Sequence, residues 1–201
     1  MPNENARLYA PATARNKEPI LGVLRQVLPP QGLVLEIASG TGEHAAHFAA
    51  NLPGLVFQPS DANGANLASI ASWTAGLANV AAPIVLDVHR QPWSAAHVDA
   101  LVCINMIHIS PWSAAVALFE GAAAALPPAA PLVLYGPFKR DGRHTAPSNA
   151  EFDESLRARD PSWGVRDLGE VADLAASKSF GAPEIYALPA NNLALVFVRA
   201  G

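Results

Sequence analysis

The stretch Leu33-Val34-Leu35-Glu36-Ile37-Ala38-Ser39-Gly40-Thr41-Gly42-Glu43-His44-Ala45-Ala46-His47 decides how this chain folds. It reads as a buried strand over residues 33–37, a tight turn that holds Gly40 and Gly42, and a helix that opens near Glu43. A strand that passes through glycines into a helix N-terminus brings backbone N–H groups close to a small ligand. Glycine fits such a turn because it has no Cβ and tolerates a positive φ. The stretch therefore predicts a ligand site where the first strand ends.

Glu36 is the unusual residue of this stretch, because it places a carboxylate at the end of an apolar strand. Burying an unpaired charge costs on the order of several kcal/mol, which is a large fraction of the stability of a domain. We therefore expect Glu36 to meet hydrogen-bond donors, either backbone N–H groups or a cation on a ligand.

The composition indicates a globular protein with one domain over residues 1–201. The chain is 51% hydrophobic and 15% charged, which is typical of a globular, alanine-rich soluble protein and unlike a disordered one. Its net charge is −4 and it contains no run of lysines or arginines, which argues against an extended nucleic-acid surface. Cys103 is the single cysteine, and its apolar surroundings predict a small buried hydrophobe.

Two segments of the sequence are relevant to where the protein resides in the cell. Residues 1–9 lack the apolar run of a secretory signal. The most apolar window, residues 118–138, is interrupted by Glu120, Pro127, Pro128 and Pro131, so it does not form one membrane-spanning helix of about 20 residues. We expect a cytoplasmic protein without a membrane partner, and the sequence does not fix its oligomeric state.

The elements alternate along the chain. The predicted strands lie near residues 33–37, 55–58, 83–86, 98–109, 131–135, 184–188 and 193–199, and the predicted helices near 16–28, 43–52, 66–77, 111–126 and 167–180. Asn16 is expected to cap the first helix. Alternation of this kind predicts a Rossmann-like, doubly wound, mostly parallel seven-stranded α/β sheet with helices on both faces and a C-terminal antiparallel hairpin. We expect residues 1–30 to form an N-terminal cap helix region and the long polar stretch 136–166 to form a lid or insertion.

Acids recur where the predicted strands end, which is the ligand-binding edge of a doubly wound sheet. Asp61 lies 21 residues beyond Gly40, where nucleoside-binding proteins place an acid that accepts hydrogen bonds from a ribose diol. Its alternative role is to cap the following helix. Asp87 ends the third strand and suits the amino group of an adenine ring, or else it is a solvated acid in a turn.

Two nucleoside cofactors fit this pattern to different degrees. The run Gly40-Thr41-Gly42-Glu43-His44-Ala45 matches the dinucleotide fingerprint G-x-G-x-x-G/A, which on its own is a weak signal. Glu36 and Glu43 around the turn would repel a pyrophosphate. The same acids suit S-adenosylmethionine, which carries an ammonium and a sulfonium and no phosphate.

The ordered set Glu36-x-Ala38-x-Gly40-x-Gly42, Asp61 and Leu86-Asp87-Val88 resembles the motifs of class I S-adenosylmethionine-dependent methyltransferases. More narrowly, most of the chain is similar to an uncharacterised methyltransferase-like family of small single-domain proteins. The stretches that carry this similarity are Ala14–Leu21, Gln58–Asp61, Ile104–Trp112, Tyr135–Phe138, and Phe152-Asp153 to Arg166-Asp167. Ser39 departs from the commonest pattern, in which glycine is frequent at this position of the turn.

The resemblance implies a cofactor site for S-adenosyl-L-methionine. Glu36 and the turn would hold the methionine moiety, Asp61 the ribose, and Asp87 and Val88 the adenine. Asn105 and Met106 would line the pocket beneath the sulfonium. The full set of implied cofactor residues is Glu36, Ala38, Ser39, Gly40, Gly42, Asp61, Asp87, Val88, Asn105 and Met106.

Residues for the acceptor are less defined by the sequence. His108, at a strand end, is the candidate base, because its ordinary pKa near 6.5 suits proton removal near neutrality, with a structural histidine as the alternative. Tyr135 is a candidate for orienting the acceptor, or a half-buried strand tyrosine. Candidates for contacting an anionic substrate or for covering the site are Arg15 and Asn16 in the first helix, and Lys139, Arg140, Arg143 and His144 in the long stretch. For the four residues of the long stretch, a solvated loop face is the alternative. No metal site is expected, because His44 and His47 at i, i+3 have no evident third ligand.

We therefore expect a methyltransferase that acts on a small-molecule acceptor. The fourth strand lacks the Asn/Asp-Pro-Pro-aromatic motif expected of an enzyme that methylates the amino groups of DNA bases. The alternatives are an NAD(P)-dependent oxidoreductase that uses the same turn, and a non-catalytic protein that binds S-adenosylmethionine.

Overall fold

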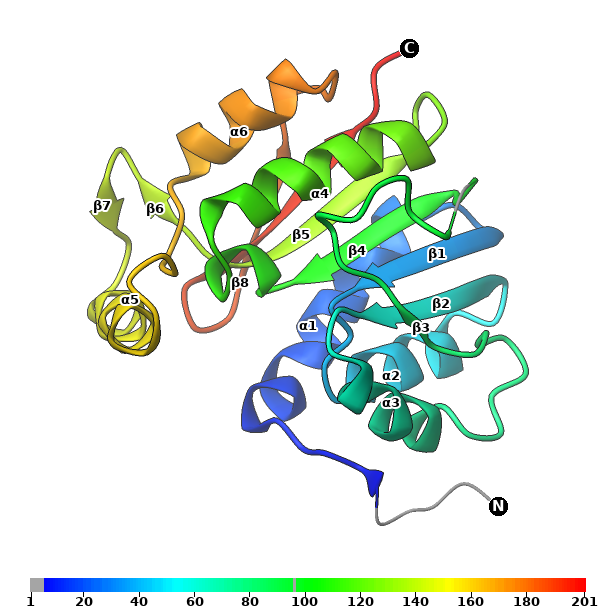
Figure 1. The fold of residues 1–201 in the computed structure, drawn as a ribbon. Helices are drawn as coiled ribbons and strands as arrows, with labels where there is room; N and C mark the ends of the chain where they lie inside the picture. Colours follow the sequence, from blue (N-terminus) through cyan, green and yellow to red (C-terminus); the bar gives the residue numbers. More distant parts are fainter. Residues whose placement is uncertain (1–5, 96) are drawn as a thin grey trace.

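A seven-stranded sheet in the order β3-β2-β1-β4-β5-β9-β8 forms the centre of the molecule (Figure 1). The structure is a computed structural model that describes residues 6–95 and 97–201. The strands of the sheet are β1 Gly32–Ile37, β2 Leu55–Asp61, β3 Ile84–Val85, β4 Ala100–Ile104, β5 Pro131–Pro137, β8 Glu184–Leu188 and β9 Asn192–Val198. The helices are α1 Pro11–Val27, α2 Glu43–Asn51, α3 Leu67–Trp73, α4 Trp112–Ala125, α5 Pro147–Arg159 and α6 Leu168–Ser177, with short 3₁₀ helices η2 Gly64–Asn66 and η3 Met106–His108. A separate hairpin joins β6 Lys139–Arg140 to β7 Arg143–His144.

Strand pairing confirms the predicted fold class. β1 pairs in parallel with β2 on one side and with β4 on the other, and β4 pairs in parallel with β5. β9 lies antiparallel to both β5 and β8, which is the predicted C-terminal hairpin. Because the strand order reverses between β1 and β4, the switch point at which such sheets bind ligands lies beside the glycine turn after β1.

Alternating side chains of the central strands build a core on each face of the sheet. Leu35 and Leu101 pack with α4 and α6 in one core, whereas Val34 and Val102 pack with α1 and α2 in the other. Figure 1 shows α4 and α6 on one side of the sheet and α1, α2 and α3 on the other. A sheet covered on both faces explains why these strands read as nearly continuous apolar runs.

The first helix begins earlier than predicted. α1 starts at Pro11, whose fixed φ suits the first helical position, and Ala12 and Ala14 favour the helix that follows. Asn16 is therefore not the N-cap but lies within the helix, where it is 8% exposed. The prediction was wrong because the capping preference of asparagine was given more weight than the proline five residues before it.

The long polar stretch after β5 is more regular than predicted. It contains the β6–β7 hairpin, whose turn residues Asp141 and Gly142 both have positive φ, and the helix α5. Figure 1 shows the hairpin and α5 next to each other, to the left of the sheet. The sequence did not predict α5, because this polar stretch gives the helix only a weakly apolar buried face.

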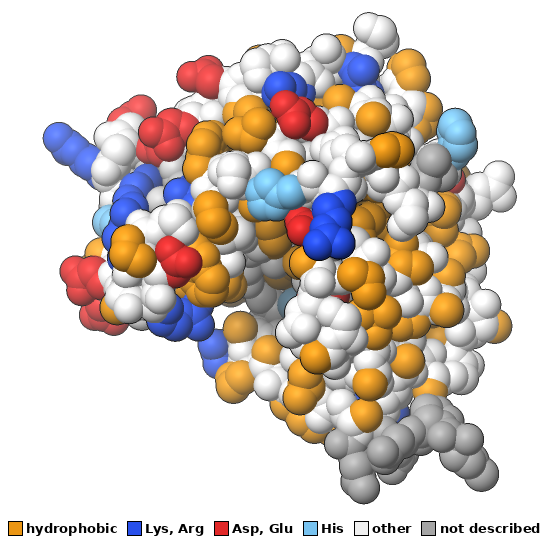
Figure 2. Space-filling model, in the orientation of Figure 1, with side chains coloured by type: hydrophobic (Ala, Val, Ile, Leu, Met, Phe, Trp, Pro, Cys, Tyr) orange, Lys and Arg blue, Asp and Glu red, His pale blue; other side chains and the backbone are white. Residues whose placement is uncertain are grey.

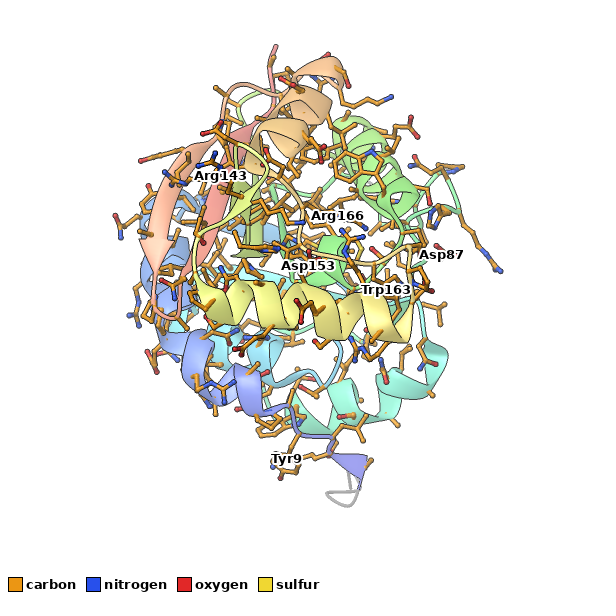
Figure 3. All side chains as sticks on the ribbon, turned by 90° about the vertical axis from the view of Figure 1, so that its left-hand side faces the viewer. Tyr9, Asp87, Arg143, Asp153, Trp163 and Arg166 are labelled. Atoms are coloured by element: carbon orange, nitrogen blue, oxygen red, sulfur yellow. The ribbon has the colours of Figure 1, made fainter. Side chains whose placement is uncertain are left out.

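Asp153 of α5 ties this segment together (Figure 3). One carboxylate oxygen, Oδ2, lies 2.9 Å from Lys139 Nζ of β6 and 3.2 Å from His144 Nε2 of β7. The other, Oδ1, accepts hydrogen bonds from the Val165 N–H (2.7 Å) and from Arg157 Nε (3.2 Å). The side chain is buried, so a single acid holds both strands of the hairpin and the chain after α5.

The structure also bears on the predictions for Cys103 and for membrane-spanning segments. Cys103 is buried in β4, as expected for a small hydrophobe. Among the described residues, no helix has both the length and the apolar character needed to cross a membrane.

Replacing Asp153 with asparagine should destabilise the protein by about 2–4 kcal/mol, because the buried carboxylate that binds the partly buried Lys139 and the Val165 N–H is lost. Burial raises the pKa of this carboxyl, but hydrogen bonds from Lys139 and the Val165 N–H outweigh burial and lower the pKa below its ordinary 3.8. Its contribution to stability is therefore present above that ordinary value and is lost as the pH falls further. Urea unfolding of Asp153→Asn at pH 7 and pH 3.5 measures this. The exposed Asp173→Asn is the control, and equal losses in the two variants would contradict the role of Asp153.

Candidate functional site

The turn between β1 and α2 lies at the carboxyl edge of the sheet. Its backbone is held by the Ser39 N–H, which donates to the Ser60 carbonyl over 2.8 Å, and by the Gly42 N–H, which donates to the Ser39 carbonyl over 2.9 Å. Gly42 has a φ of 89°, and a Cβ there would lie 2.5 Å from the Ile70 Cα of α3. Only glycine therefore allows the turn and α3 to approach this closely.

Asp61 connects the turn to the end of β2. Its Oδ2 accepts a hydrogen bond from the Gly40 N–H at 2.8 Å, and its Oδ1 accepts one from the Asn63 N–H at 2.9 Å. Asn63, and not Asp61, caps the following 3₁₀ helix, so the capping alternative for Asp61 was wrong. Each carboxylate oxygen has a second lone pair, which leaves Asp61 able to accept bonds from a ligand.

Glu36 is buried at the end of β1 with no hydrogen-bond partner for its Oε2 among the described residues. Burial raises its pKa to about 7; the Ser39 hydroxyl lowers the pKa and the Asp61 carboxylate raises it. The expected backbone N–H donors do not reach this oxygen. Glu36 is therefore poised between its neutral and charged forms at neutral pH, and a cation beside it would favour the charged form.

Glu43 differs from Glu36 because it has a partner. Its Oε1 lies 2.8 Å from Lys17 Nζ of α1, and the side chain is also at the positive end of α2. The charge of Glu43 is thus compensated within the protein. Of the two acids predicted to repel a pyrophosphate, only Glu36 has no cation of the described residues to compensate its charge, so the predicted repulsion comes from Glu36.

Asp87 lies after β3 at a pocket of about 310 Å³ (Figure 3). Its Oδ1 accepts a hydrogen bond from the His89 N–H at 3.0 Å, which lowers the pKa of Asp87, although partial burial opposes this. Arg90 Nε approaches the other oxygen at 3.8 Å. Val88 is buried beneath this turn. The pocket is lined by Ala62, Val85, Leu86, Asp87, Arg90, Pro92, Trp93 and Ser94.

β4 ends at the opposite side of the switch point. Asn105 has a φ of 61°, and its N–H donates to the Tyr135 carbonyl at 2.8 Å, which joins the ends of β4 and β5. Met106 follows in η3 and is partly buried against the core. The turn after β1 and the ends of β2, β4 and β5 thus form one continuous edge.

His108 is fully buried in η3, in an arrangement that opposes the predicted role as a base. Its Nδ1 accepts a hydrogen bond from the Arg166 N–H at 3.2 Å, so the neutral ring carries its proton on Nε2. Burial, aided by the Arg166 charge, lowers its pKa to about 3. Gly136 of β5 makes room for the ring, since a Cβ there would lie 2.4 Å from Nε2. His108 Nδ1 is bound to the Arg166 N–H, and the buried Nε2 has no hydrogen-bond partner among the described residues. A buried, neutral histidine of this kind is suited to positioning η3 and not to removing a proton.

Tyr135 and the first helix meet at a second pocket, of about 200 Å³. Asn16 Oδ1 lies 2.8 Å from His44 Nε2, so Asn16 links α1 to α2. Burial lowers the pKa of His44 to about 4, so its ring is neutral at neutral pH, and the tautomer with its proton on Nε2 donates to Asn16 Oδ1. The pocket is lined by Ala12, Arg15, Asn16, Pro19, Tyr135, Pro189, Ala190 and Asn192.

The predicted lid residues separate into two groups. Lys139 is bound to Asp153, so it is a structural residue of the hairpin, whereas Arg143 is exposed on β7. Sequence reasoning did not assign a role to Arg166, whose Nε donates to the Ile107 carbonyl (2.9 Å) and whose Nη2 donates to the Ser110 carbonyl (2.6 Å). The sequence signal was its position at the end of the stretch 152–167. In the described residues, no three His, Cys, Asp or Glu side chains gather as metal ligands.

Several solved structures with a similar fold are methyltransferases. The fold is similar to mitomycin 7-O-methyltransferase (TM-score 0.80, 14% identity, 94% of this chain and 54% of that one). It is also similar to human N-acetylserotonin methyltransferase in complex with SAM (TM-score 0.79, 14% identity, 94% and 53%). A third match is an O-methyltransferase family protein from Burkholderia thailandensis (TM-score 0.76, 17% identity, 94% and 58%). This chain thus spans a little over half the length of these proteins, and at such identities the likeness establishes the Rossmann-like methyltransferase fold.

The family assignment covers almost the whole chain. Residues 7–199 match a single family, which includes the turn after β1, Asp61, Asp87, η3 and the segment with Asp153. This agrees with the resemblance to an uncharacterised methyltransferase-like family. The chain belongs to the family described as "Protein of unknown function (DUF938)".

Proposed function

We propose that this protein is an S-adenosylmethionine-dependent methyltransferase that acts on a small-molecule acceptor. The observation that carries the proposal is the row of acids Glu36, Asp61 and Asp87, which end β1, β2 and β3 around a glycine turn. The cations that approach this row, Lys17 and Arg90, are already matched with Glu43 and Asp87. A row of this charge suits a cationic nucleoside without phosphate.

The proposed roles follow the order of the strands. The turn residues Ala38, Ser39, Gly40 and Gly42, together with Glu36, bind the methionine moiety. Asp61 accepts from the ribose hydroxyls, the pocket beside Asp87 and Val88 takes the adenine, and Asn105 and Met106 lie below the sulfonium. The residues of each group lie at the same edge of the sheet, in the order β3, β2, β1, β4.

When bound, the cofactor supplies a methyl group activated by a sulfonium. The protein then has to align the acceptor and exclude water, since transfer from a sulfonium is mainly a problem of positioning and desolvation. His108 contributes by fixing η3, and Tyr135, at the end of the next strand, lies within reach of an acceptor in the second pocket. An acid–base residue is not required for this reaction class.

The similar structures support this proposal over the oxidoreductase alternative. Their names specify methyltransferases, one of them in complex with SAM, and none of those described above is an oxidoreductase. Glu36, whose Oε2 has no hydrogen-bond partner among the described residues, also disfavours a pyrophosphate. The other alternative, a non-catalytic binding protein, predicts that the cofactor binds without turnover. We also propose a cytoplasmic location for the methyltransferase.

Replacing Asp61 with alanine should weaken binding of S-adenosylhomocysteine by about ten- to a hundredfold, because two charge-assisted hydrogen bonds to the ribose are lost. Isothermal titration calorimetry measures the change. Asp99→Ala is the matched control, because Asp99 also holds a strand end, through the Leu33 N–H at 2.7 Å, but at the other edge of the sheet. Wild-type affinity in Asp61→Ala would remove Asp61 from the site, and no binding to the wild-type protein would refute the proposed cofactor.

Affinity for S-adenosylhomocysteine should rise with pH as Glu36 ionises around its pKa of about 7. The ammonium of the ligand favours the carboxylate, so binding is weaker where Glu36 is protonated. Calorimetry from about pH 6 to 8 should show this rise in the wild type and a nearly flat profile in Glu36→Gln. At pH 8 the ligand-free variant should be at least as stable as the wild type, since it no longer buries a charge. A matching pH profile in both proteins would contradict this role for Glu36.

A further inference from the structure

Three arginines of this protein differ from all its other cations. Of the 13 lysine and arginine residues in the chain, ten have a hydrogen bond, an ion pair or an aromatic ring as partner. The remaining three, which have no hydrogen-bond or ion-pair partner among the described residues, are Arg15, Arg140 and Arg143. All three are exposed.

Two of these arginines face the same turn from two sides. Arg15 lines the pocket of about 200 Å³ between α1 and the β8–β9 turn. Arg140 lines a neighbouring pocket of about 530 Å³, which shares Pro189, Ala190 and Asn192 of that turn. No carboxylate lines either pocket. The two pockets therefore form one region of uncompensated positive charge.

The β6–β7 hairpin concentrates this charge further. Arg140 and Arg143 are direct cross-strand partners, and like charges in this position repel one another. Lys139 and His144, the other two hairpin residues with side-chain nitrogens, are held by Asp153. Of the acids near the hairpin, Asp167 accepts from the Gly142 N–H at 2.7 Å, and Asp141 is exposed in the turn with no ion pair among the described residues. Figure 2 shows Lys and Arg side chains on its left side, over β6, β7 and α5, next to a hollow and interspersed with Asp and Glu side chains.

The smaller pocket lies one strand away from the proposed cofactor site. Tyr135 forms its floor, and the Tyr135 carbonyl accepts from the Asn105 N–H at the end of β4. Asn16 accepts from His44 through Oδ1, which leaves its amide N–H groups for the Tyr135 phenol. Burial raises the pKa of Tyr135, while the Asn16 hydrogen bond and the Arg15 charge act in the opposite direction. The phenol therefore stays protonated and has its O–H to donate into the pocket.

We propose that the acceptor is a small molecule with an anionic group, a carboxylate or a phosphate, that binds beside the β8–β9 turn between Arg15 and Arg140, with the Tyr135 hydroxyl as a hydrogen-bond donor. Arg143 adds to the attraction from the opposite strand. The smaller pocket is below the usual 300–1,000 Å³ of ligand sites, which fits one ring or a short chain. That the bound molecule is a methyl acceptor rests on the proposed function; that the region binds anions does not.

Benzoate, phenyl phosphate and the neutral benzamide are suitable probes. Their binding is measured by ligand-observed NMR and calorimetry, each with and without S-adenosylhomocysteine, on the wild type, Arg15→Gln, Arg140→Gln and the double variant. Arg25→Gln is the matched control, since it removes an exposed arginine that contacts Asn51, away from these pockets. We expect one or both anions to bind and benzamide not to bind, with affinity reduced about tenfold in each single variant, unchanged in Arg25→Gln, and lowered by added salt.

Each outcome has a distinct meaning. A preference for benzoate or for phenyl phosphate identifies the anionic group as a carboxylate or a phosphate. Equal binding of benzamide and the anions, or equal affinity in Arg15→Gln, Arg140→Gln and Arg25→Gln, would overturn the inference while leaving the proposed cofactor intact. Anion binding that depends on the two arginines in a protein that does not bind S-adenosylhomocysteine would instead refute the proposed function and retain the anion site.

Discussion

The hydrogen bond from the Gly40 N–H to Asp61 organises the ligand-binding edge of this protein. β1 and β2 run in parallel, so the turn after β1 and the end of β2 are adjacent, and one carboxylate fixes their relative position at 2.8 Å. The close contact of Gly42 with Ile70 then sets α3 against the same turn. Three separate parts of the chain are thereby brought together around Glu36, whose Oε2 has no hydrogen-bond partner among the described residues.

The second half of the site depends on the chain after β5. Asp153 fastens the β6–β7 hairpin and the chain that follows α5, and Arg166 then crosses to the carbonyls of Ile107 and Ser110. The Gly164 N–H also donates to the His108 carbonyl at 2.9 Å. The segment that contributes Arg140 and Arg143 is thus attached to η3, and through η3 to the end of β4.

Features set by a few neighbouring residues could be predicted from the sequence, whereas features set by contacts between distant residues could not. The apolar runs around Val34 and Val102 and the glycine turn gave the parallel sheet, because strand periodicity and turn chemistry are encoded over a few residues. The start of α1 was misplaced because two helix-start signals, Pro11 and Asn16, lie close together. The helix α5 was missed because it is amphipathic only weakly and is held mainly through Asp153, whose partners are distant in sequence.

The candidate site divides in the same way. The positions of Glu36, Asp61 and Asp87 at strand ends followed from the sequence, and the structure brings them to one edge. Their partners did not follow: a sequence does not say that Lys17 reaches Glu43, or that Lys139 is taken by Asp153 and leaves Arg140 without an acid. The state of His108 depends on the Arg166 N–H, 58 residues further along the chain. Roles that depend on burial and distant partners require the three-dimensional structure.

The attachment of the segment after β5 has a consequence for selectivity. Its two ends and its middle are each held by buried or charge-assisted hydrogen bonds, and opening it would break the bonds of Asp153 and Arg166 together. These bonds favour a fixed wall beside the pocket that Arg140 lines over a hinged flap. Under the proposed function, such a wall selects the acceptor by the shape and charge of a preformed opening, before the molecule reaches the transferable group, and not by closing around whatever has entered.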